Sequence, residues 1–240
     1  LDYDAVEYLN HKAKAFYNDS VFMGVYLAQL SLYHWNKGYI DSSLYYDYKS
    51  IDILSRHNPK LCHKPYFSIS QSYKQIDSTS LSLKYGIRAF ESIQDNLFNR
   101  NDSTLFTSIC YNLHTIYDQH TDHTNLSEKY LNIALDMVSK TNDPDNRVVL
   151  NNALILKLMH QNNIDSAYNL CMENIGIIKE ASLISYLSYS YTNMGKLLYD
   201  KDDYSLSLKY LDSAIAVKNG DWSSRLTAHK IKILVSPKTE

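Results

Sequence analysis

The hexapeptide SLSLKY occurs twice in this chain, at Ser80 to Tyr85 and again at Ser205 to Tyr210. Three further stretches carry a related phrase, and all five can be aligned on a small residue near their start. These anchor residues are Ser43, Ser82, Ser127, Ala167 and Ser207. They lie 39, 45, 40 and 40 residues apart, a near-constant period that is typical of repeat architectures. The chain is therefore predicted to consist of a copied unit of about 40 residues.

Each aligned phrase has the spacing of an amphipathic helix. Tyr204, Leu208, Leu211 and Ile215 recur at intervals of three or four residues, which places them on one face. A second helical segment precedes most of the phrases, so each unit is predicted to be two antiparallel helices. The chain has 6 Gly and 4 Pro, too few for the many tight turns of a sheet-rich fold. We expect an all-α protein.

Capping residues mark several expected helix boundaries. Asp143 before Pro144 is typical of an N-cap followed by proline in the first turn, and Gly220-Asp221 indicates a helix end followed by a new cap. We expect the polar joins at residues 101–103 and 202–203 to act in the same way. The links between helices are thus predicted to be short turns.

The pattern of large and small residues within the units resembles that of the tetratricopeptide repeat (TPR) family. One unit carries it at Tyr191, Met194, Gly195, Leu198, Ser207, Leu211 and Ala214, and another at Tyr66, Ile69, Ser70, Tyr73, Ser82 and Ala89. The fourth unit departs from it, with Asn151 and Ile155 where a large aromatic and a small residue are usual. The resemblance implies a right-handed α-solenoid of about five antiparallel helix pairs.

The resemblance covers most of the chain and predicts one continuous solenoid over residues 1–240. Residues 1–17 are expected to form a leading helix, residues 18–218 the five helix pairs, and residues 219–240 a partial or capping helix. The period exceeds the roughly 34 residues usual for the family, which implies longer helices.

The family binds peptides or partner segments on a concave face formed by the first helix of each pair. Matching its groove positions residue by residue predicts partner contacts at Trp35, Phe67, Gln71, Lys74, Tyr111, Thr115, Asn152, Met159, Tyr189, Lys196 and Tyr199, with Val25, Ala28, Leu32, Asp118, Leu156 and Thr192 as further lining residues. Tyrosine, with 22 residues, supplies large contact areas with a polar tip, although many tyrosines fall at repeat-packing positions instead.

The composition gives little support to other classes of function. The formal net charge of −2 provides no basic patch for nucleic acid, so we expect no direct nucleic-acid binding by this segment. An apolar run of about 18 residues is missing, so we also expect no membrane insertion by it. Cys62, Cys110 and Cys171 read as apolar core residues and favour a reducing, cytoplasmic compartment. The chain starts at Leu1, so an export signal or anchor could precede it.

Two stretches of the sequence contain residue types that could form a metal site or a catalytic site. The stretch HTIYDQHTDH (residues 114–123) offers imidazoles and carboxylates that suit zinc, but it coincides with a packing position and a polar turn. The stretch RHNPKLCHK (residues 56–64) offers a thiol and two imidazoles in a helix connection, where a catalytic base is not held in place. We therefore predict no catalytic residue, no metal and no cofactor.

The sequence thus predicts a non-enzymatic scaffold that binds a protein or peptide. The alternative is a sensory or regulatory domain of a larger bacterial signalling or transcription-regulating protein, since long-repeat members of the family occur in such proteins. An enzyme on a helical scaffold is the third and least supported interpretation.

Overall fold

The computed structural model of the chain describes residues 19–94, 100–120, 123–141, 143–218 and 220–238. The leading helix predicted for residues 1–17 lies outside them. The chain divides into two compact units, unit 1 (residues 1–141) and unit 2 (residues 142–240), and each is treated by itself. A single solenoid across both units stays a prediction.

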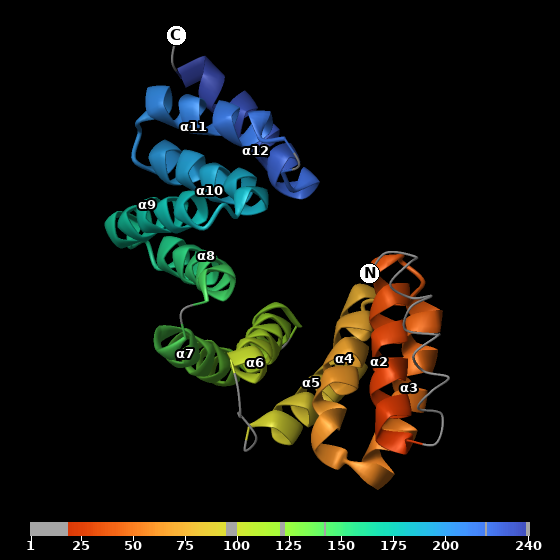
Figure 1. The fold of residues 1–240 in the computed structure, drawn as a ribbon. Coiled ribbons are helices and arrows are strands. Elements are labelled where there is room, and N and C mark those ends of the chain that lie inside the picture. The colour runs from red at the N-terminus through yellow and green to blue at the C-terminus, as the bar shows by residue number, and fades with distance from the viewer. Residues whose placement is uncertain (1–18, 95–99, 121–122, 142, 219, 239–240) are drawn as a thin grey trace. The chain divides into compact units, whose positions relative to one another are not determined.

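The described residues are helical, and no strand occurs among them (Figure 1). Unit 1 contains α2 (Ser20–Asn36), α3 (Ile40–His57), the short 3₁₀ helix η1 (Pro59–Cys62), α4 (His63–Gln75), α5 (Thr79–Ile93), α6 (Arg100–His120) and α7 (Thr124–Lys140). Unit 2 contains α8 (Pro144–His160), α9 (Ile164–Glu180), η2 (Ile184–Tyr186), α10 (Leu187–Asp200), α11 (Tyr204–Ala216), α12 (Trp222–Val235) and η3 (Ser236–Lys238). Successive helices pack as five pairs, from α2/α3 to α10/α11, which confirms the predicted helix-pair repeat.

The small anchor residues mark the closest approach of the two helices in each pair. All five are buried, and each lies in the second helix. In α4/α5 the Ser70 hydroxyl donates to the Ser82 carbonyl at 2.7 Å, and the Ser82 hydroxyl donates to the Ser70 carbonyl at 2.8 Å. In α10/α11 the Ser207 hydroxyl donates to the carbonyl of Gly195 at 2.7 Å. Serine here combines small size with a hydrogen bond that ties the helices together.

A recurring turn joins the two helices of a pair. Two residues after the first helix, the backbone enters the left-handed region, which Gly, Asn and Asp tolerate better than other residues. These residues are Gly38 (φ 80°), Asp77 (φ 56°), Asn162 (φ 58°) and Asp202 (φ 62°). The next N–H then bonds to the carbonyl five residues back, as from Asn163 to Leu158 at 2.8 Å. The predicted short turns therefore have a common geometry.

The expected caps are present, with one correction. Asp143, Asp203 and Asp221 accept backbone N–H groups at the starts of α8, α11 and α12. Residues 101–103, predicted to be a join, are instead helical, because α6 begins at Arg100. Acidic and hydroxyl residues are also favourable in the first turn of a helix, so the same composition fits both positions.

The weakly matching fourth pair has Ile155 where the second and fifth pairs have Ser70 and Gly195. Ile155 in α8 is fully buried and forms part of one apolar core with Ala167, Cys171, Ile178 and other residues of unit 2. Asn151 is also buried, and its amide nitrogen has no hydrogen-bond partner within the described part of the chain. This pair therefore carries a polar group that its core does not satisfy.

Within the described ranges, none of the helices combines the length and apolar character that crossing a membrane would need.

Candidate functional site

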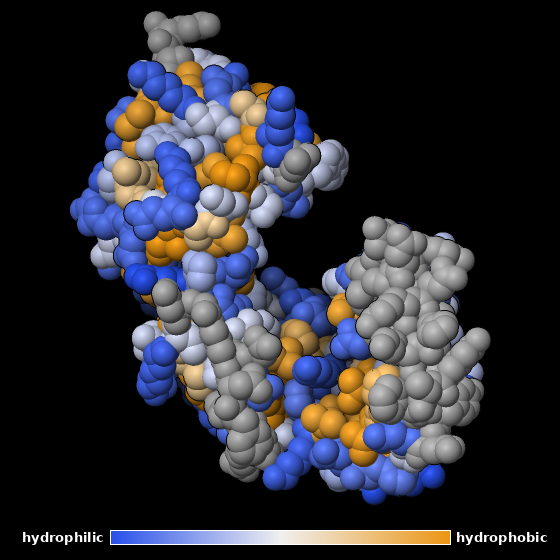
Figure 2. Space-filling model, viewed as in Figure 1, coloured by the Kyte–Doolittle hydropathy of each residue, from blue (hydrophilic) through white to orange (hydrophobic). Residues whose placement is uncertain are grey.

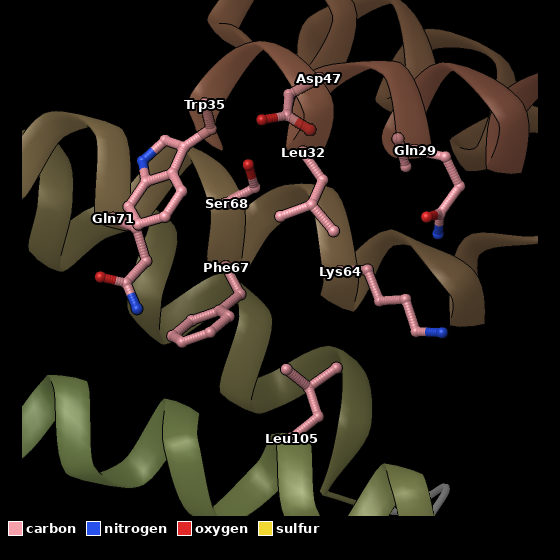
Figure 3. Close-up of a pocket in the computed structure, with 10 residues that line it drawn as sticks. Gln29, Leu32, Trp35, Asp47, Lys64, Phe67, Ser68, Gln71 and Leu105 are labelled. Carbon is pink, nitrogen blue, oxygen red and sulfur yellow. The ribbon is translucent and has the colours of Figure 1, made fainter. Parts of the chain in front are cut away.

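A pocket of about 410 Å³ opens in unit 1 against the first helices of its pairs (Figure 3). Its lining residues come from α2, α3, α4 and α6: Ala28, Gln29, Leu32, Trp35, Asp47, Lys64, Phe67, Ser68, Gln71 and Leu105. Apolar side chains gather over the part of unit 1 where α4 and α5 are drawn (Figure 2). Five residues predicted from the family resemblance thus come together in one place, namely Ala28, Leu32, Trp35, Phe67 and Gln71.

Helical spacing explains why these side chains converge. Ala28, Leu32 and Trp35 follow one another by four and three residues in α2, so they share a face. Phe67 and Gln71 are four apart in α4 and face the same space (Figure 3). Leu32 remains 43% exposed, which is high for an apolar side chain and leaves it free to contact a partner.

Asp47 of α3 forms the polar end of the pocket and was not predicted. Its side chain is fully buried, and neither carboxyl oxygen has a hydrogen-bond partner among the described residues. The hydroxyls of Ser31 and Ser68 lie near enough to lower its pKa by hydrogen bonding, although neither has the distance and angle of a full hydrogen bond to the carboxyl. Burial dominates and raises the pKa of the Asp47 carboxyl to about 7.

The repeat register shows that Asp47 is an exception. It lies four residues after its anchor, on the packing face of the second helix. The residues at this position in the other four pairs are Gly86, Leu131, Cys171 and Leu211, all buried. A carboxyl at a position that otherwise takes small or apolar residues costs stability, and such exceptions cluster at functional sites.

A second buried polar group without a hydrogen-bond partner among the described residues is the indole N–H of Trp35. Buried donors and acceptors are almost always paired in folded proteins. The ring lines the pocket, whereas its N–H lies on the side away from Asp47 (Figure 3).

Lys74 and Thr115, also predicted as groove residues, bond to each other between α4 and α6. The Lys74 ammonium donates to Thr115 Oγ1 at 2.5 Å and lies 3.5 Å from Asn112 Oδ1. The Asn112 amide in turn donates to Ser70 Oγ at 2.9 Å. Burial lowers the pKa of Lys74. This network links two neighbouring pairs, so part of the predicted lining serves packing. Tyr111 is half-buried, with its ring beside that of His114.

The residues predicted in unit 2 lie in different surroundings. Met159 is buried in the core, and Asn152 is buried and accepts from the Asn174 amide at 2.9 Å. Tyr189 is half-buried, and burial raises its pKa. Lys238 lies 4.5 Å from the Tyr199 ring centre and donates to its hydroxyl at 3.0 Å. Lys196 is exposed.

The position of Asp47 could have been recognised from the sequence. The expected groove was formed by the first helix of each pair, whereas Asp47 lies in a second helix, between two tyrosines. Its spacing of four from Ser43 nevertheless indicates a buried face, on which Ser50 and Leu54 also lie. Gln29, Lys64, Ser68 and Leu105 also line the pocket, and no spacing rule singled them out.

Neither the cluster at residues 114–123 nor the one at residues 56–64 forms an assembled site in the described part of the chain. Among the described residues no three metal-ligating side chains come together, although Asp122 lies outside them. Cys62 is buried, which raises its thiol pKa, and the neighbouring His63 ring nitrogen Nδ1 is 2.7 Å from the Lys60 carbonyl. Burial also raises the pKa of Cys110 and Cys171 to about 12, as expected for apolar core cysteines.

The sequence matches no protein-family model, and no curated protein matches it. Solved structures do match. NprR in complex with its cognate peptide NprX is 17% identical, with a TM-score of 0.70 over 100% of this chain and 69% of that one. Aspartyl phosphate phosphatase F from Bacillus subtilis is 15% identical, with a TM-score of 0.70 over 92% of this chain and 59% of that one.

A third match is a signal transduction ATPase with a tetratricopeptide repeat sensor from Pyrococcus horikoshii. It is 12% identical, with a TM-score of 0.65 over 88% of this chain and 30% of that one. At these identities the likeness concerns the fold. Together with the five helix pairs and their buried small anchors, it shows an all-α fold of TPR-like helical repeats, of the kind found in solenoid proteins.

Proposed function

We propose that this chain is a protein- or peptide-binding regulatory scaffold whose binding surface is the pocketed face of α2, α4 and α6 in unit 1. The observation that carries the proposal is the pocket itself, which gathers Trp35, Phe67 and Gln71 near the buried Asp47 carboxyl. Apolar walls with a few placed polar groups are typical of binding sites. Aromatic side chains in such a position often provide most of the binding energy.

A peptide fits this surface better than a compact small molecule does. The pocket is open on one side, and exposed apolar groups such as Leu32 and Val25 extend from it along α2. One of the similar structures, NprR, was solved with a bound peptide, which supports this ligand class by analogy.

The finer proposal is that the chain acts as the sensory part of a longer regulatory protein. The support is that it spans 69% of NprR and 30% of the Pyrococcus horikoshii ATPase that has a TPR sensor. The proposal includes no turnover: the lining residues include one carboxyl, that of Asp47, and neither a histidine nor a cysteine that could act with it. One similar protein is named as a phosphatase, so a phosphatase assay belongs among the controls.

A peptide selection tests the proposal. The whole chain would be used to enrich binders from a random peptide library, and their affinities for wild type, Phe67→Ala and Lys84→Ala would be compared. Lys84 is exposed on the second helix α5 and serves as the matched control. We expect Phe67→Ala to weaken binding by about 2 kcal/mol, roughly 30-fold, with Lys84→Ala unchanged. Enriched peptides that bind both variants equally would place the binding surface elsewhere.

A further inference from the structure

The pocket of unit 1 is lined by a fully buried carboxyl, that of Asp47, which the described residues do not pair with a cation or a full hydrogen bond. A buried carboxylate without a partner is strongly unfavourable, and in other proteins it is paired with a cation or protonated. The other four repeats avoid this cost with a small or apolar residue at the same position.

We infer that the pocket receives a basic side chain, lysine or arginine, from the peptide partner, with its cationic end against Asp47. The inference deepens the proposed function and rests on it. An ammonium or guanidinium group supplies the donors that the carboxylate lacks, and charge-assisted hydrogen bonds are the strongest kind.

The remaining lining matches the other parts of such a ligand. Leu32, Phe67 and Leu105 form apolar walls that can cover the methylene stem of a basic side chain (Figure 3). The pocket thus presents an acceptor and an apolar wall, as binding of one basic side chain requires.

The charged and titratable surroundings allow this assignment. The Ser31 hydroxyl from α2 and the Ser68 hydroxyl from α4 are the neighbours that act on the Asp47 carboxyl. On α2 the His34 ring stacks on Tyr46 of α3 at 5.1 Å, and its Nδ1 is buried without a partner in the described chain. Lys64, the charged residue of α4 at the pocket, is exposed and points away from Asp47 (Figure 3).

This arrangement predicts a pH-dependent affinity. A cation binds the ionised carboxylate, and the ionised fraction of Asp47 increases as the pH rises through about 7. The affinity for a basic ligand should therefore rise between roughly pH 6 and pH 8 and level off above that range.

The test uses n-butylammonium, which reproduces a lysine side chain, and 1-pentanol, a neutral alcohol of similar shape with one more carbon. Trp222→Phe leaves Trp35 as the single tryptophan, so fluorescence reports on the pocket. In this background we expect n-butylammonium to bind more tightly than 1-pentanol at pH 8. Asp47→Asn should weaken the affinity for n-butylammonium about tenfold or more and leave the affinity for 1-pentanol unchanged. Asp52→Asn is the matched control, since Asp52 is exposed on the same helix.

Equal binding of n-butylammonium and 1-pentanol to wild type, or equal binding of n-butylammonium to wild type and Asp47→Asn, would overturn the inference. Asp47→Leu, which restores the residue type of other repeats, is a second variant if Asp47→Asn folds poorly. Selected peptides that depend on Phe67 but carry no basic residue would reject the inference and leave the proposed function standing. Peptides that do not depend on Phe67 would reject the proposed function, and the n-butylammonium titration would still decide the preference of the pocket for a cation.

Discussion

Phe67 of α4 and Thr192 of α10 occupy the same place in their repeats, three residues before the small residues Ser70 and Gly195. In unit 1 the large Phe67 lines an open pocket. In unit 2 the short Thr192 is buried, and its hydroxyl lies 3.2 Å from the Ser224 carbonyl of α12. The repeat position fixes the direction of a side chain, whereas the size of the residue decides whether the next helix closes over it.

The second helices show the same contrast. Asp47 in α3 and Leu211 in α11 are equivalent and fully buried. Leu211 packs in an apolar core with Ala214, Ala228 and Val235, whereas Asp47 faces a pocket without a hydrogen-bond partner among the described residues. Unit 2 therefore follows the packing rule of the repeat, and unit 1 departs from it at the place where we propose binding.

The largest expected effect tests this contrast through pH. The folded-state pKa of Asp47 is about 7 and its ordinary value is 3.8, so the unfolded chain loses this proton at lower pH. Stability from this residue is then fully present below pH 4 and is lost as the pH rises to about 7. The loss corresponds to at most about 4 kcal/mol. Urea unfolding of wild type and Asp47→Asn between pH 4 and pH 8 measures it.

In that experiment wild type should lose stability relative to Asp47→Asn as the pH rises from 4 to 8. A difference that stays constant over the whole range would contradict the buried, unpartnered state of Asp47.

A smaller effect is expected in unit 2, where the helices approach closely. A Cβ atom on Gly195 would lie 2.7 Å from Leu211 Cγ and Cδ2, both in the core. Gly195→Leu should therefore cost about 1–3 kcal/mol through overpacking. Gly176→Leu in α9 is the matched control, because a Cβ there meets nothing within 4 Å. Thermal unfolding should show a lower melting temperature for Gly195→Leu alone, and equal melting of both variants would refute the tight contact.

Much of the fold followed from the sequence, because the periodic small residues report directly on packing. The anchors, the helix pairs and the caps at Asp143 and Asp203 were all predictable from local rules. The bounds of α6 were not, since polar residues suit both a join and a first helical turn.

Only part of the proposed binding site could be predicted from the sequence. Trp35, Phe67 and Gln71 line the pocket, and they were predicted by matching the groove positions of the TPR family. Met159 and Asn152 occupy groove positions but are buried, since the packing of unit 2 depends on side chains far away in the sequence. Asp47 was not predicted because only the first helix of each pair was expected to form the groove, and Asp47 lies in a second helix.

The smallest effect contrasts an exposed charge pair with the buried charge of unit 1. Arg147 and Glu173 of unit 2 are 2.6 Å apart, and their side chains are 53% and 49% exposed. Arg147→Gln should lower the stability by less than about 1 kcal/mol, and by still less at high salt. Chemical denaturation at two ionic strengths checks this, and a loss as large as that of Gly195→Leu would show that exposed charges matter more here than we expect.

Hydrogen exchange, followed by mass spectrometry with and without a selected peptide, tests the central claim most directly, because it reports on the two units separately. We predict that the bound peptide slows exchange in α2 and α4 of unit 1 and leaves α10 and α12 of unit 2 unchanged. Slower exchange confined to α10 and α12, with α2 and α4 unaffected, would contradict the assignment of the binding surface to unit 1.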